Sequence, residues 1–131
     1  MHRGAAPPEA MNSDFEELLS IFNENGVRYL IVGGHAVMLY TEPRYTKDLD
    51  VWIDASAENG ERVYRSLLAF GAPLAGMTTK DFAGEGSFYQ PNRQQSKLGN
   101  AQAWFIGRGE LLRNKRAAGR HIDLHDAELL E

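Results

Sequence analysis

The 131-residue sequence contains no cysteine, which excludes disulfide bonds and thiolate metal sites. It has no apolar run long enough to span a bilayer, and its first ten residues lack the apolar stretch of a secretory signal. We therefore expect a cytoplasmic protein without membrane contact. The formal net charge of -4 gives no overall attraction for nucleic acid, so any such contact requires a local basic patch.

Length and composition favour one globular domain with one core, since 43% of the residues are hydrophobic. Pro7, Pro8 and the small residues around them predict a flexible leader over residues 1–12, followed by a single domain over 13–131. Residues 71–101 are rich in glycine and polar residues and show almost no periodicity. They predict an irregular segment that is either functional or flexible.

Helices and strands alternate through the first half of the chain. Ser13 and Glu16 have the spacing of a capping box and predict a helix start. Apolar spacing then predicts helices over 13–26, 35–40 and 56–70 and strands over 27–32 and 48–53. A short strand at 103–107 and two closing helices, over 108–119 and 121–131, complete an α/β (α+β) pattern with a small mixed sheet flanked by helices.

Asp48 and Asp50 lie one residue apart in "DLDVWI", which otherwise indicates a buried strand. Because side chains alternate along a strand, both carboxylates are expected on one face and Leu49 on the other. Two such charges repel and are costly to desolvate unless a cation neutralises them. Mg²⁺ or Mn²⁺ binds carboxylate oxygens and keeps positions open for phosphate. The simpler alternative is that these aspartates cap turns or pair with a nearby arginine.

A pair of adjacent glycines lies before the two aspartates in the sequence. Gly33 and Gly34 end one predicted strand and open a helix, where backbone N–H groups can hold phosphate. Arg44 and Lys47 add cations beside the carboxylates. A Gly-Gly pair alone is common in loops. Together with the aspartates, however, it forms a more specific signal for binding a metal and a polyphosphate.

The stretch "GGHAVMLYTEPRYTKDLDVWI" resembles the nucleotidyltransferase-fold superfamily, in particular small bacterial nucleotidyltransferase-like proteins related to abortive-infection toxins. It is also similar to the core of aminoglycoside and lincosamide nucleotidyltransferases, where Gly-Gly, Arg-x-Thr and Asp-x-Asp follow in this order. The ending "ELLRNKRAAGRHIDLHDAELLE" resembles the closing helices of the toxin-related group. The resemblance covers residues 13–70 and 105–131 and implies a nucleotidyltransferase-like fold.

The resemblance also implies a reaction, in which an acceptor hydroxyl attacks the α-phosphate of an NTP and releases pyrophosphate. The resemblance implies as acceptor an RNA such as a tRNA end, a protein or a small molecule, without choosing among them, and it implies a toxin–antitoxin or phage-defence setting. The implied roles are Mg²⁺ (or Mn²⁺) ligation and catalysis by the aspartate pair, and nucleotide or phosphate binding by a second group of residues. The first group is Asp48 and Asp50, and the second is Gly33, Gly34, Arg44, Thr46 and Lys115.

One element of the family pattern is not visible in this sequence. Such enzymes usually carry a third carboxylate on a later strand, which orients or deprotonates the attacking hydroxyl. After "FYQ" the chain passes almost directly to its closing helices. Asp123 is better explained as an acid at a helix start. The alternative function is therefore a catalytically degenerate module that binds an NTP, a partner protein or a second copy of itself.

Other candidate residues have ordinary structural interpretations. His121 and His125 are spaced for one helix face and two zinc ligands, but a third ligand is not identified, which favours a solvated face. His35 either contacts phosphate or bonds locally to the backbone. The basic helix over 108–119 indicates either phosphate or RNA contact or simple surface charge. Trp52 and Trp104 are interpreted as core or interface residues.

Overall fold

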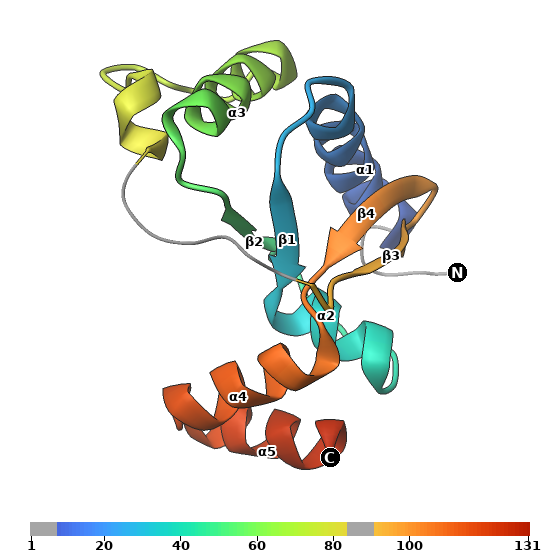
Figure 1. Cartoon of the computed structure of the whole chain (residues 1–131). Coiled ribbons are helices and arrows are strands. Elements are labelled where there is room, and N and C mark those ends of the chain that lie inside the picture. The colour runs from blue at the N-terminus through green and yellow to red at the C-terminus, as the bar shows by residue number, and fades with distance from the viewer. Residues whose placement is uncertain (1–7, 84–90) are drawn as a thin grey trace. The chain divides into compact units, whose positions relative to one another are not determined.

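The computed structural model describes the backbone of residues 8–83 and 91–131 and the side chains of residues 13–83 and 91–131 (Figure 1). The first half of the chain forms helix α1 (Pro8–Glu24), strand β1 (Tyr29–Val32), helix α2 (Gly33–Tyr40), strand β2 (Asp50–Ile53) and helix α3 (Ala57–Phe70). The second half forms a short 3-10 helix η1 (Thr79–Phe82), strands β3 (Gln94–Leu98) and β4 (Ala101–Phe105), and helices α4 (Arg108–Ala118) and α5 (His121–Leu130). The predicted mixed α/β class is confirmed.

The sheet has the strand order β2-β1-β4-β3. β1 and β4 are parallel, with Ile31 opposite Phe105. β2 runs antiparallel to β1, because Asp50 lies beside Gly33 and the Asp54 N–H donates to the Arg28 carbonyl oxygen at the other end. The sheet is therefore mixed, and β2 forms one of its edges.

Contacts within the chain define two compact units, and each is described by itself. Unit 1 comprises the described residues of Met1–Tyr29, Ile53–Tyr89 and Gln95–Ala103. Unit 2 comprises those of Leu30–Trp52, Gln90–Gln94 and Trp104–Glu131. The sequence alone predicts one domain and gives no sign of this division.

In unit 1, helix α3 packs against α1 and η1. Ser56 caps the start of α3 through its side chain, and Gly71 follows the helix with a positive φ, so the helix predicted over 56–70 has nearly the observed bounds. The rings of Phe22 and Tyr29 lie 5.6 Å apart. Buried apolar side chains form the core of this unit: Leu19, Phe22, Val27, Tyr29, Val63, Leu98, Ala101 and Ala103.

In unit 2, helices α4 and α5 pack on each other, and α2 contacts both (Figure 1). The Tyr40 hydroxyl at the end of α2 donates to the Ile106 carbonyl oxygen at 2.6 Å. Among the described residues of this unit, buried apolar side chains form the core: Leu30, Ile31, Val32, Ala36, Val37, Phe105, Ile106, Leu111, Ala127 and Leu130. This core fixes α2, and with it the diglycine at its start.

The N-terminal helix starts earlier than the sequence predicts. α1 begins at Pro8, so the flexible leader predicted over residues 1–12 is wrong for residues 8–12, and residues 1–7 lie outside the described part. Proline is well tolerated in the first turn of a helix because its missing N–H has no partner there. Ser13 lies inside the helix and does not cap it, and Glu16 accepts a hydrogen bond from the Asn100 N–H at 3.0 Å.

The segment 71–101, predicted to be irregular, contains regular structure. It includes η1 and β3, and Gly99 and Asn100 connect β3 to β4 as a two-residue hairpin turn with a φ of +59° at Gly99. The prediction missed β3 because "QQSKL" is mostly exposed and lacks an apolar alternation. Residues 84–90 of the same segment lie outside the described residues.

No helix among the described residues is both long enough and apolar enough to cross a membrane.

We predict that Asn59→Ala destabilises the protein by about 2 kcal/mol. The buried Asn59 side chain accepts a hydrogen bond from the Arg28 N–H at 2.7 Å and donates to the carbonyl oxygens of Arg28 and Asp54 at 3.1 and 2.7 Å. Alanine leaves these backbone groups without that partner. Urea unfolding followed by circular dichroism measures the effect.

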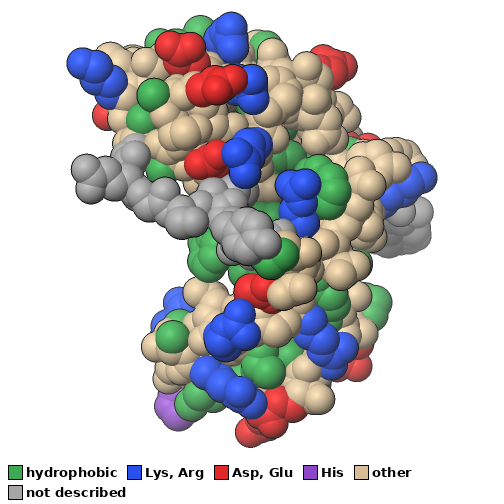
Figure 2. Space-filling view, in the orientation of Figure 1, with side chains coloured by type: hydrophobic (Ala, Val, Ile, Leu, Met, Phe, Trp, Pro, Cys, Tyr) green, Lys and Arg blue, Asp and Glu red, His purple; other side chains and the backbone are tan. Residues whose placement is uncertain are grey.

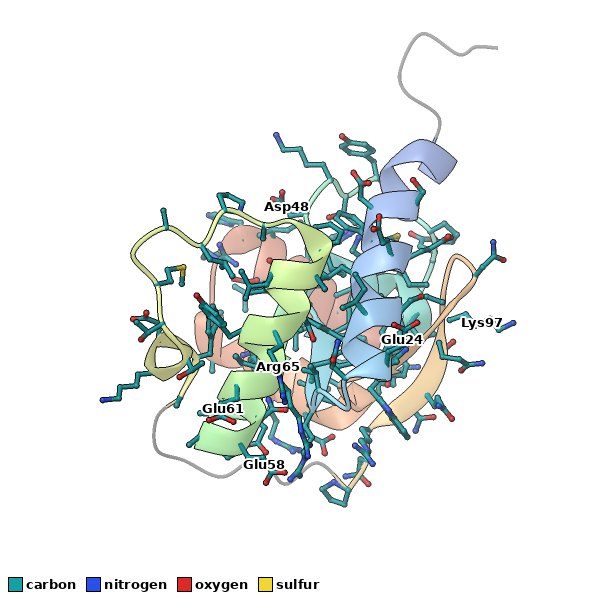
Figure 3. The ribbon with its side chains drawn as sticks, turned by 90° about the horizontal axis from the view of Figure 1, so that it is seen from above. Glu24, Asp48, Glu58, Glu61, Arg65 and Lys97 are labelled. Atoms are coloured by element: carbon teal, nitrogen blue, oxygen red, sulfur yellow. The ribbon has the colours of Figure 1, made fainter. Side chains whose placement is uncertain are left out.

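The matched control is Glu61→Ala, an exposed position on the same helix (Figure 3). It is expected to change the unfolding free energy by no more than about 0.5 kcal/mol. Equal effects of the two substitutions would contradict the role given to Asn59.

Candidate functional site

The diglycine at the start of α2 lies directly against Asp50 and Thr46. Gly33 has a φ of +67°, and a Cβ placed on it would overlap the Asp50 carboxylate, with Asp50 Cγ at 3.1 Å. A Cβ on Gly34 would lie 3.0 Å from Thr46 Oγ1. Only residues without a side chain permit both approaches together with the left-handed backbone at Gly33. The structure thus brings Gly33, Gly34, Thr46 and Asp50 together.

Asp48 lies outside the strand that the sequence predicts for it. β2 begins at Asp50, so the strand predicted from residue 48 is wrong for its first two residues. The physical reason is the end of β1: Asp50 already faces Gly33, where the chain turns into α2, and no β1 residue remains opposite Asp48. Asp48 instead belongs to the connecting segment before β2 (Figure 3).

The exposure of residues 48–53 still alternates with a period of two. Asp48, Asp50 and Trp52 are exposed, whereas the residues between them are partly buried. The interpretation of a buried strand is therefore wrong, because β2 is an edge strand. Asp50 and Trp52 lie on one face of β2, and the Trp52 side chain, interpreted from sequence as core or interface, is 41% exposed on that face.

His35 follows the diglycine and is buried in α2. Burial lowers its pKa below the ordinary value, and the negative charge of Asp50 opposes this only in part. The imidazole is therefore neutral at neutral pH. His35 supplies no positive charge beside the carboxylates.

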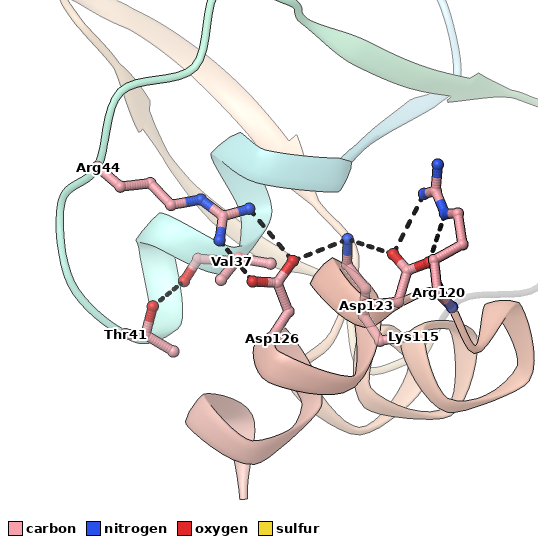
Figure 4. Close-up of polar contacts among 7 residues, drawn as sticks. All are labelled: Val37, Thr41, Arg44, Lys115, Arg120, Asp123 and Asp126. Carbon is pink, nitrogen blue, oxygen red and sulfur yellow. Dashed lines mark hydrogen bonds and ion pairs between the residues drawn. The ribbon is translucent and has the colours of Figure 1, made fainter.

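Five charged side chains form a continuous series of ion pairs in unit 2 (Figure 4). The Arg44 guanidinium makes two bonds to the Asp126 carboxylate, at 2.5 and 3.2 Å. Lys115 Nζ lies between two carboxylates, 3.1 Å from Asp126 and 3.3 Å from Asp123. Arg120 completes the series with a 2.6 Å bond from its Nε to Asp123. Positive and negative groups thus alternate from the 41–49 segment to the start of α5.

Burial is deepest at the centre of this series. The side chains of Asp126 and Asp123 are 0% and 1% exposed, and Lys115 is 9% exposed. Arg44 is 29% exposed and Arg120 is 74% exposed, so both ends of the series reach solvent. Three cations and two carboxylates take part, which leaves one positive charge in excess. Buried charges such as these persist because each of the two carboxylates is both ion-paired and hydrogen-bonded.

The two aspartates are held in their charged form. The hydrogen bond from Arg120 is the largest influence on Asp123 and, with Lys115, lowers its pKa to about 2 despite burial. Burial raises the pKa of Asp126, but the hydrogen bonds from Arg44 and Lys115 outweigh it and the pKa is lowered. The interpretation of Asp123 as an acid at a helix start is confirmed, since its carboxylate accepts a bond from the Arg120 N–H in the first turn of α5.

The sequence-predicted site residues therefore fall into two groups. Gly33, Gly34, Thr46 and Asp50 meet at the start of α2, with Asp48 just before β2. Arg44 and Lys115 meet around a different residue, Asp126. Sequence reasoning missed Asp126. The available signal was the spacing of Asp123 and Asp126, which places two acids three residues apart on one face of a closing helix.

The Lys and Arg side chains of the basic helix predicted over 108–119 are only partly available for other contacts. Figure 2 shows Lys and Arg side chains gathered over α4 and the neighbouring turn. Arg116 pairs with Glu131 at 3.0 Å, and Arg108 donates to the Leu130 carbonyl oxygen at 2.7 Å. Several of these cations thus hold α4 to α5.

The metal candidates differ in their chemistry. Asp48 and Asp50 offer exposed carboxylate oxygens, which suit Mg²⁺ or Mn²⁺. His121 and His125 are exposed on α5. Among the described side chains, no group of three or more His, Cys, Asp or Glu residues is placed to hold a metal ion.

No protein-family model matches the chain, and no curated protein matches it.

We predict that Gly33→Ala destabilises unit 2 through both backbone strain and steric overlap of the new Cβ with the Asp50 carboxylate. A left-handed backbone costs a non-glycine residue about 1–2 kcal/mol, and displacement of the Asp50 carboxylate adds an overpacking cost of about 1–3 kcal/mol. Chemical denaturation measures the change in unfolding free energy. Gly76→Ala is the control, because Gly76 has a φ of +81° and nothing lies within 4 Å of its Cβ position. Equal costs at both positions would contradict the close approach of Asp50.

The ion-pair series predicts a specific loss of stability in acid. The pKa of Asp123 is lower in the folded chain, so the unfolded chain takes up its proton first as the pH falls. The stabilisation is fully present above about pH 4 and is lost towards about pH 2. We expect Asp123→Asn to flatten the dependence of stability on pH in this window.

Urea midpoints between pH 2 and 6 test this expectation. Asp14→Asn, at an exposed position on α1, should keep the acid dependence of the unsubstituted protein. Parallel curves for Asp123→Asn and the unsubstituted chain would refute the assignment.

Proposed function

We propose that this protein is a Mg²⁺-dependent nucleotidyltransferase that transfers NMP from an NTP to an acceptor hydroxyl. The observation that carries the proposal is the contact between the diglycine and Asp50, which a Cβ at Gly33 would abolish. This contact supports a site in which a phosphate-binding turn lies next to a metal-binding carboxylate. The resemblance of "GGHAVMLYTEPRYTKDLDVWI" to nucleotidyltransferases gives the same order of functions along the chain.

Asp48 and Asp50 are the proposed metal ligands. Both are exposed, and exposed carboxylate oxygens are the donors that Mg²⁺ and Mn²⁺ prefer. When bound, the metal neutralises charge on the phosphates and on the departing pyrophosphate.

The start of α2 is the proposed phosphate-binding element. The first N–H groups of a helix lack intrahelical partners and carry partial positive charge. Because Gly33 and Gly34 have no side chains, Asp50 and Thr46 lie directly against the start of the helix, so a phosphate bound at its N–H groups would lie next to the proposed metal-binding carboxylate. Thr46 adds a hydroxyl beside Gly34. These groups would orient the α-phosphate for attack, and positioning of this kind supplies much of the catalysis in phosphoryl transfer.

The proposed reaction forms a bond between the acceptor oxygen and the α-phosphorus and breaks the bond from that phosphorus to the β-phosphate oxygen. Pyrophosphate leaves, and the hydroxyl proton passes to water, because neither β3 nor β4 carries a carboxylate to accept it. The partly exposed Arg44 and the one positive charge in excess in its ion-pair series favour an anionic ligand nearby. Lys115, which is buried between two aspartates, would act on phosphate only through this field.

One observation favours a second candidate, a non-catalytic module that binds an NTP or a protein. Arg44 and Lys115, the cations expected at the nucleotide, are both paired with Asp126. Such a module keeps the diglycine and carboxylates for binding and transfers nothing. It would pair with a partner protein or a second copy of itself. In the enzyme, the acceptor would be RNA such as a tRNA end, a protein or a small molecule, in a cytoplasmic toxin–antitoxin or defence setting.

Label transfer tests the proposal. The protein is incubated with Mg²⁺, each NTP labelled at the α-phosphate, and either total RNA or cell lysate. We expect label on one acceptor class, and we expect Asp48→Asn or Asp50→Asn to lower transfer by on the order of 100-fold. Mn²⁺ binding followed by electron paramagnetic resonance should weaken in the same variants.

Glu61→Gln is the matched control, because it removes an exposed carboxylate on α3 in unit 1, whereas the proposed site residues belong to unit 2. It should leave both transfer and Mn²⁺ binding unchanged. Thermal stabilisation by an NTP without label transfer would support the binding module instead. Absence of both transfer and NTP-dependent stabilisation would refute both candidates.

A further inference from the structure

Residues 41–49 link α2 to β2 without forming a helix or strand of their own. This connection contains Thr46, which lies against Gly34, and Asp48. Its conformation therefore decides where two of the proposed functional side chains lie. Irregular segments of this kind need specific side-chain bonds to hold one conformation.

Two bonded residues anchor the segment within unit 2 (Figure 4). At its start, the N–H and the hydroxyl of Thr41 both donate to the Val37 carbonyl oxygen in α2, at 2.9 and 2.7 Å. Three residues later, Arg44 reaches the Asp126 carboxylate on α5 through its two bonds. Arg44 is thus the anchor nearest to Thr46 and Asp48.

Asp126 is shared between this anchor and the buried centre of the ion-pair series. Its side chain is 0% exposed and also lies 3.1 Å from Lys115 Nζ. If Asp126 were neutral, Arg44 and Lys115 would face each other without their common counter-charge. Arg44, at 29% exposed, would gain more by turning to solvent than buried Lys115 would.

We propose that Asp126 is a positioning residue for the nucleotidyltransferase site, acting through Arg44 to fix the 41–49 segment and with it Thr46 and Asp48. This role rests on the proposed function for its consequence in binding and transfer. The anchoring itself is a property of unit 2 and is measurable without any ligand. Asp126 would touch neither metal nor nucleotide.

Asp123 provides a matched comparison within the same series. It is equally buried and also pairs with Lys115, but its other partner is Arg120 at the start of α5. The loss of Asp123 removes a buried carboxylate without touching the Arg44 bonds. A purely structural role would make Asp126→Asn and Asp123→Asn alike, whereas the positioning role makes them differ in the 41–49 segment.

Hydrogen exchange measured by mass spectrometry separates the two cases at a temperature where both variants are folded by circular dichroism. We expect Asp126→Asn to accelerate exchange of peptides covering 41–49 by about 10-fold or more, and Asp123→Asn to leave them within about 2-fold of the unsubstituted protein. Arg44→Met should reproduce the Asp126→Asn pattern. In the Arg44→Met background, Asp126→Asn should add no further acceleration over 41–49, because Arg44→Met has already removed the bonds between the two side chains.

Mn²⁺ titration of the same proteins links the anchor to the site. Asp126→Asn should weaken Mn²⁺ binding about 10-fold relative to Asp123→Asn, and Asp126→Glu, which keeps the charge, should recover part of it. Unchanged exchange over 41–49 in Asp126→Asn would overturn the anchoring. Faster exchange with unchanged Mn²⁺ affinity would overturn the positioning role. A chain that binds no Mn²⁺ and transfers no NMP would refute the proposed function and the role in the site, while the exchange data would still report the anchor.

Discussion

The candidate site depends on the absence of a side chain at Gly33. Its left-handed backbone ends β1 and starts α2 in one step, and its missing Cβ leaves room for the Asp50 carboxylate. The same turn limits β2, since no β1 residue remains to pair with the residues before Asp50. One backbone conformation therefore sets the start of a helix, the end of a strand pairing and the position of a charged group.

A second constraint holds the segment between α2 and β2 in place. Asp126 is buried, and this is tolerable because Arg44 and Lys115 share its charge. The group is local to unit 2, whose apolar core fixes α2 and the two closing helices. Two separate features thus determine the site: the space left by the glycines at the start of α2, and the ion pairs that join the 41–49 segment to the closing helices. The first sets where Asp50 lies, and the second restrains the chain before it.

The sequence predicts the parts of this arrangement that are local. Gly33, Gly34 and Asp50 lie within one short stretch, and strand alternation with a glycine turn suffices to suggest that they meet. The contact between Arg44 and Asp126 joins residues 82 positions apart, and it depends on which face of α5 turns towards α2. β3 escaped prediction because an exposed edge strand carries no apolar pattern. The early start of α1 was not predicted, because a proline such as Pro8 suits both a flexible leader and the first turn of a helix.

The position of β2 in the strand order has a further consequence for self-association. Among the described strands, β2 and β3 are the edges of the sheet, and an open edge offers backbone groups on which another chain can add a strand. Asp50 on β2 and Asp48 just before it place two like charges at one edge strand, and Lys97 places a charge on β3, the other edge strand. Charged side chains at such positions discourage strand addition. The carboxylates proposed to bind a metal would therefore also discourage another chain from pairing with this edge.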